Sequence, residues 1–140
     1  MPAISTLYNL SNVLGVNMGD FFESESNSPK IVVCREIDRV PISDKTSFGY
    51  GYEALAVQKK DKIMDPFFTK VSPGRKKTEF VHKGEEFMFV TEGTLKLTYG
   101  GEEYILEKGD SVYIESSTAH KLEAVGDQPV YVLSINAKAT

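Results

Sequence analysis

The fold is decided by two stretches of this 140-residue sequence, residues 80–93, FVHKGEEFMFVTEG, and residues 109–120, GDSVYIESSTAH. Each stretch combines a histidine with an apolar run typical of a β-strand and with glycine, which favours a turn. His82 and His120 are the only two histidines of the chain. We expect the two stretches to bring both imidazoles and the carboxylate of Glu86 to one point inside a β-barrel.

Short apolar runs separated by turn residues continue on both sides of these stretches. They lie at residues 31–34, 50–57, 67–71, 87–90, 95–99, 104–106, 112–114, 120–122 and 130–135. Gly100 and Gly101 favour a tight hairpin between two of the runs. Many short strands with regular glycine turns predict an all-β sandwich or barrel. Cys34, inside the first run, is expected to be a small buried side chain rather than a redox sensor.

The N-terminal part of the chain has a different pattern. Leu7, Leu10 and Leu14 repeat at helical spacing, and they predict helices over residues 5–22. Residues 23–29 are polar and rich in serine, which is typical of a linker. A short helical appendage is therefore expected in front of the β domain.

Composition limits the classes of function. The net charge of −4 argues against a nucleic-acid-binding surface spread over the whole chain. A single cysteine excludes an intrachain disulfide and suits a reducing cytoplasm. No apolar run approaches the ~18 residues of a membrane span, and no signal peptide is visible. We therefore expect a soluble cytoplasmic protein without a membrane partner.

The two histidine stretches resemble the paired motifs of the cupin superfamily. The first cupin motif runs His-x-His, then glutamate, then glycine, and the second runs Gly-Asp, an apolar pair, then histidine. The resemblance implies an antiparallel jelly-roll barrel in which three histidines and one glutamate converge on a metal. His82, Glu86 and His120 match three of these ligands, whereas Phe80 occupies the position of the first histidine.

A narrower resemblance is carried by residues 82–93, HKGEEFMFVTEG, and residues 99–113, YGGEEYILEKGDSVY. They look like the sensor cupin of Xre-type bacterial transcription regulators. Residues 2–22 are similar to the last two helices of a lambda-repressor-like helix-turn-helix domain. The resemblance implies a helix-turn-helix remnant at 1–22, a linker at 23–30 and a cupin domain at 31–140. The helices that read DNA in that family are missing from this remnant.

The resemblance implies a small-molecule effector and a homodimer, with DNA binding only in a full-length form that has the complete helix-turn-helix. The residues expected to bind the ligand are Phe80, His82, Glu86, Met88, His120, Tyr52 and Tyr113.

Two interpretations of the histidines and Glu86 stay open. His82, Glu86 and His120 can coordinate iron, manganese, nickel or zinc and leave positions open for a ligand. Alternatively, they line a pocket without a metal, which the apolar ring of Phe80 favours.

Three functions are compatible with this sequence. The leading hypothesis is a small-molecule-sensing and dimerisation domain of a transcriptional regulator. The second is a small metal-dependent cupin enzyme of the dioxygenase or isomerase type, against which the missing first histidine and the helix-turn-helix remnant both count. The third is an oligomerisation module with a vestigial pocket. An enzyme is the less favoured class.

Overall fold

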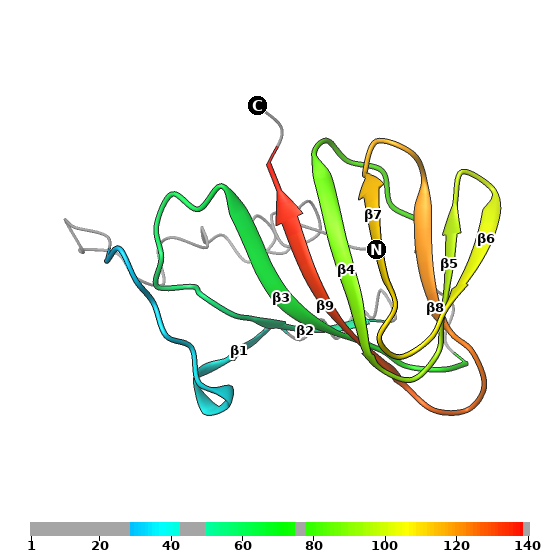
Figure 1. Ribbon diagram of the computed structural model, residues 1–140, viewed down its shortest axis with the longest axis horizontal. Coiled ribbons are helices and arrows are strands. Elements are labelled where there is room, and N and C mark those ends of the chain that lie inside the picture. The colour runs from blue at the N-terminus through cyan, green and yellow to red at the C-terminus, as the bar shows by residue number, and fades with distance from the viewer. Residues whose placement is uncertain (1–28, 43–49, 75–77, 139–140) are drawn as a thin grey trace.

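The computed structural model describes residues 29–42, 50–74 and 78–138, and these residues form an all-β domain (Figure 1). The predicted all-β class is therefore confirmed. The helices expected at 5–22 and most of the expected linker lie outside the described residues. In chain order the elements are η2 Glu36–Asp38, β1 Val40–Ile42, β2 Tyr50–Ala54, β3 Met64–Val71, β4 Glu85–Glu92, β5 Leu95–Tyr99, β6 Glu102–Leu106, β7 Ser111–Glu115, β8 His120–Ala124 and β9 Val130–Ala137.

The strands form two antiparallel sheets. The larger sheet has the order β1-β2-β3-β9-β4-β7, and the smaller sheet has the order β6-β5-β8. Figure 1 shows β5, β6 and β8 together at one end of the molecule, beyond β4 and β7. In the described part of the chain, no helix is long and apolar enough to cross a membrane.

The hydrophobic core contains side chains from both sheets, and alternation along strands such as β2, β4 and β9 creates it. In β9, every second residue from Val130 to Asn136 is buried. Val130 and Val132 belong to the same buried cluster as Leu97 and Leu122 of the smaller sheet. Because successive side chains of a strand point to opposite faces, this alternation gives each strand one inward face. The polar exceptions on that face mark the candidate site.

Glycines make the turns that the chain needs at two places. Gly100 and Gly101 both have positive φ, as a two-residue hairpin between β5 and β6 requires. Gly93 has a φ of 86°, and a Cβ atom there would lie 2.7 Å from the carbonyl oxygen of Pro129. The hairpin predicted at Gly100 and Gly101 is confirmed.

The strand predicted at residues 31–34 is wrong. These residues pair with no strand in the described ranges, and Ile31 and Val33 are 78% and 58% exposed. Cys34 is partly exposed and its Sγ atom contacts the carbonyl oxygen of Arg35, so the expected burial is also wrong. Sequence alone missed β1, which has three residues and contains Pro41; proline is confined to sheet edges because it lacks a donor.

Candidate functional site

Glu86 lies on the inward face of β4, between β9 and the edge strand β7 of the larger sheet. It is opposite Ile114 of β7 on one side and Asn136 of β9 on the other. The side chain is 1% exposed, and neither carboxylate oxygen accepts a hydrogen bond of normal geometry from the described residues, although the amide of Asn136 is near enough to favour the charged form. Burial raises the pKa of Glu86 well above its usual range. A carboxylate in this position needs a cation or a proton.

His120 reaches the same place from the smaller sheet, as the first residue of β8. Its backbone exchanges two hydrogen bonds with Phe80, of 2.8 and 2.9 Å. Its Nδ1 atom lies 2.8 Å from the carbonyl oxygen of Thr118. Because a carbonyl only accepts, Nδ1 carries a proton. The other ring nitrogen, Nε2, faces the carboxylate of Glu86 in the interior.

His82 lies in the segment that leads into β4. Its backbone N–H donates to the carbonyl oxygen of Ser116 at 3.0 Å, and its Nδ1 donates to the carbonyl oxygen of Lys83 at 3.0 Å. Among the described residues, Nε2 of His82 is buried without a hydrogen-bond partner. Burial lowers the pKa of His82, which favours the neutral imidazole.

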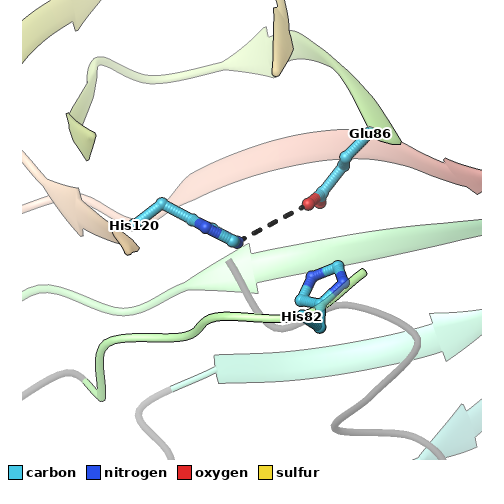
Figure 2. A group of neighbouring side chains, drawn as sticks. All are labelled: His82, Glu86 and His120. Carbon is cyan, nitrogen blue, oxygen red and sulfur yellow. Dashed lines mark ion pairs between the residues drawn. The ribbon is translucent and has the colours of Figure 1, made fainter. Parts of the chain in front are cut away.

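The three side chains converge (Figure 2). Nε2 of His120 is 3.9 Å from Oε1 of Glu86, and the two imidazole rings have centroids 5.4 Å apart. One ligand atom from each residue lies within 4.8 Å of the others, so the group can hold a metal ion. Metal-ligating histidines usually donate their other ring N–H to a carbonyl or carboxylate, as both do here. Two imidazole nitrogens and one carboxylate oxygen therefore fit iron, manganese, nickel or zinc.

Several aromatic and apolar side chains share the interior with this cluster. Phe80, the residue at the first histidine position, is partly buried, and its ring centroid is 5.9 Å from that of Tyr50. The ring centroids of Tyr52 and Tyr50 are 6.2 Å apart. Met88 follows Glu86 on the same face of β4. The structure thus places Phe80, Tyr52 and Met88 in the interior; their role in binding a ligand stays a prediction.

The structure does not bring Tyr113 to the cluster. Its neighbours Val112 and Ile114 on β7 pack in the core, so alternation points Tyr113 outward, where it is 63% exposed. Its hydroxyl group donates to the carboxylate of Glu85, another outward residue. The expected interior role of Tyr113 therefore has no structural basis.

Sequence analysis missed two polar residues of the interior, Asn136 and Ser116. Both are fully buried, and their side-chain atoms have no hydrogen-bond partner within the described ranges. A signal for Asn136 was present, because β9 alternates and places Ser134 and Asn136 on the same face as Val130 and Val132.

The chain belongs to the cupin domain family, whose model matches residues 67–136. The regulator PuuR of Escherichia coli strain K12, a helix-turn-helix-type transcriptional regulator, is 28% identical over 141 residues, which cover 99% of this chain and 75% of PuuR. An uncharacterised protein of Methanocaldococcus jannaschii, MJ1618, is 35% identical over 52 residues, or 37% of this chain and 42% of that protein. The resemblance to cupins of Xre-type regulators is thereby confirmed.

Solved structures show the same fold. The cupin domain of an XRE family transcriptional regulator from Enterobacter cloacae has a TM-score of 0.59 and 20% identity, over 66% of this chain and 99% of that one. The iron(II) form of HppE has a TM-score of 0.70 and 21% identity, over 96% of this chain and 75% of that one. Hydroxypropylphosphonic acid epoxidase from S. wedmorenis has a TM-score of 0.68 and 22% identity, over 96% and 74%. The cupin fold is therefore confirmed.

Proposed function

We propose that this chain is the small-molecule-sensing and dimerisation domain of a transcriptional regulator, and that its effector binds beside a metal held by His82, Glu86 and His120. The observation that carries the regulatory role is the similarity to PuuR, a transcriptional regulator, over 99% of the chain. The buried cluster of three ligands supports the place where the effector binds. We assign this function to the cytoplasm, with no membrane partner.

The position of the cluster explains how binding could be sensed. Glu86 belongs to the larger sheet and His120 to the smaller sheet, so a metal bound by both connects the two sheets. An effector changes the population of two conformations only when it binds one of them more tightly. A ligand that completes coordination between two sheets has this property, because its affinity depends on their separation.

The donor set leaves room for the effector. A zinc ion with three protein ligands keeps one open position, and an octahedral iron, manganese or nickel ion keeps three. When bound, the metal supplies a positive charge and open coordination positions inside an apolar surrounding. Phe80 lies beside His120 and offers no ligand atom, so the effector takes the space that a fourth protein ligand would occupy.

Dimerisation is supported by apolar side chains on the N-terminal side of β1. Ile31, Val33 and Ile37 are all strongly exposed, with Ile37 91% exposed. Neighbouring exposed apolar side chains commonly mark interfaces, and two-fold dimers are the most common assembly. A second copy that covers these side chains would set the spacing of two DNA-reading heads. We propose DNA binding only for a form with a complete helix-turn-helix.

Thermal unfolding with added metals and metabolites tests this proposal. At a hundredfold excess over its dissociation constant, a true ligand stabilises the fold by ~2.7 kcal/mol. We expect one transition metal to raise the melting temperature, and one class of metabolite to raise it further only when that metal is present. If no metabolite changes the melting temperature of the metal-loaded protein, the sensing role is wrong and a vestigial oligomerisation module is favoured.

A metal-dependent enzyme of the dioxygenase or isomerase type is the second candidate. The specific observation in its favour is the set of two histidines and one carboxylate, which is the ligand set of many non-haem iron(II) oxygenases. Oxygen consumption by the iron(II)-loaded protein separates a dioxygenase from a sensor: turnover with a candidate substrate supports the enzyme. Binding of the same compound without turnover supports the sensor.

A further inference from the structure

We propose that Asn136 forms a neutral hydrogen-bonding subsite next to the metal cluster, and that this subsite selects a small 2-hydroxy or 2-amino monocarboxylate. The inference rests on the proposed metal site and names the chemical class of its ligand.

Unsatisfied polar atoms gather at this one place in the interior. Five buried side-chain atoms of the cluster and of Asn136 have no hydrogen-bond partner in the described part of the chain: Nε2 of His82, both carboxylate oxygens of Glu86, and both Nδ2 and Oδ1 of Asn136. Native proteins leave few buried polar atoms unsatisfied, and such groups need an explanation. A metal accounts for His82 and Glu86, but it does not account for the amide of Asn136.

Asn136 is placed to contact whatever binds at the cluster. It lies on β9 directly opposite Glu86 of β4, and both side chains are buried on the inward face. The amide is near enough to favour the charged form of Glu86, although no hydrogen bond of normal geometry joins them. Two positions away on the same face, Ser134 is bonded to Thr69 at 3.4 Å. On the inward face of β9, Asn136 is therefore the polar side chain that lacks hydrogen-bond partners.

The stability of the fold does not explain why a buried amide without hydrogen bonds occupies position 136. Burying an amide without hydrogen bonds is unfavourable, whereas an apolar side chain of the same size would avoid that penalty. A group that is costly for the isolated fold is expected where a ligand is bound. The amide offers two donors and one acceptor oxygen, so its complement carries both an acceptor and a donor.

Charge narrows the ligand class. Glu86 with two neutral imidazoles and a divalent cation has a net charge of +1, which favours a ligand with one negative charge. Asp65, on the other side of Asn136, is paired with Lys62 at 3.7 Å, so this pair adds no net charge. A monocarboxylate supplies the negative charge and an acceptor for the amide N–H.

The acceptor oxygen of Asn136 requires a donor on the ligand, which a hydroxyl or amino group supplies. On the carbon next to the carboxylate, this group also chelates the metal through a five-membered ring. Phe80 pairs with His120, and Met88 follows Glu86 on the inward face of β4, so apolar side chains lie next to the site and favour a small ligand. A 2-hydroxy or 2-amino monocarboxylate meets all of these requirements.

The test uses the full chain loaded with zinc, with glycolate as the probe and acetate, which lacks the hydroxyl group, as the matched compound. Titration calorimetry is expected to give tighter binding of glycolate than of acetate. In Asn136→Leu, glycolate affinity is expected to fall roughly tenfold or more, with zinc content per chain unchanged. Ile135→Val, on the outward face of the same strand, is the control and should bind glycolate like the wild type.

The metal-free proteins provide a second readout. Asn136→Leu should be at least as stable as the wild type without metal, because it removes an unsatisfied buried amide. The proposal is overturned if Asn136→Leu keeps full glycolate affinity, if it clearly destabilises the metal-free fold, or if glycolate binds no better than acetate. Failure of the wild type to hold zinc overturns the proposed metal site itself, so the two failures are distinguishable.

Discussion

Replacing Glu86 with glutamine separates the two roles of this buried carboxylate. It destabilises the metal-free fold, and it is a ligand in the metal-bound fold. Glu86 is fully buried and accepts no hydrogen bond of normal geometry from the described residues. Its pKa in the fold is raised by burial, whereas the unfolded chain has the ordinary value of about 4.5. Glu86→Gln keeps the size of the side chain and removes its charge.

The pH dependence follows from the sign of this shift. A group whose pKa is raised on folding contributes stability below its unfolded pKa and loses that contribution as pH rises through its folded pKa. Without metal, the stability of the wild type relative to Glu86→Gln therefore falls above pH 4.5, by up to about 1.4 kcal/mol for each pH unit until the folded pKa is reached. At pH 8 the metal-free variant is expected to be the more stable protein.

Bound metal is expected to make the wild type more stable than Glu86→Gln. At a hundredfold excess over its dissociation constant, the metal stabilises the wild type by ~2.7 kcal/mol, or roughly 10 °C in melting temperature for a domain of this size. Glu86→Gln lacks the anionic ligand and should show little of this increase. Thermal and urea unfolding from pH 5 to 8, with and without zinc, measure both effects.

The matched control is Glu85→Gln, which changes the exposed neighbour on the outward face of β4. It should respond to zinc like the wild type. The reasoning is refuted if Glu86→Gln is less stable than the wild type without metal at pH 8, or if zinc stabilises both proteins equally.

Three further predictions follow from the packing. Gly93→Ala should lower the free energy of unfolding by at least about 2 kcal/mol in urea titrations, because the new Cβ would lie 2.7 Å from the carbonyl oxygen of Pro129 at a positive φ; an unchanged value would contradict this close approach of the two backbones. Tyr50→Phe should lower it by about 1–3 kcal/mol, because the buried backbone of Leu122 loses a partner 3.1 Å away, and a neutral result would show that water replaces the hydroxyl. Ile31→Asp should shift the dimer towards monomer in analytical ultracentrifugation without changing zinc content, and an unchanged equilibrium would place the interface elsewhere.

Most of the fold could be predicted because its signals are local. Alternating apolar residues identify β5, and the paired glycines Gly100 and Gly101 identify the hairpin that leads into β6. The run at 31–34 has the composition of a strand, but composition does not specify a pairing partner, and none exists in the described ranges. The short edge strand β1 was missed for the opposite reason. Its composition, with Pro41, does not favour a strand, but its pairing with β2 creates one.

The candidate site was predictable as far as its motif extends. His82, Glu86 and His120 could be found because both histidines fall on motif positions, and the structure brings them together. Tyr113 was misplaced by one step, since one position along a strand changes the face. Asn136 could not be recognised as a neighbour of Glu86, because the two residues meet only through the long-range pairing of β4 with β9.

The most direct measurement is the transition-metal content of the purified, untagged protein after reconstitution with iron, manganese, nickel or zinc and removal of excess metal. The proposed site predicts about one metal ion per chain in the wild type and a large loss in His120→Ala. No retained metal with any of the four ions, in a protein that is folded, would contradict the metal site and leave a pocket for an organic ligand alone.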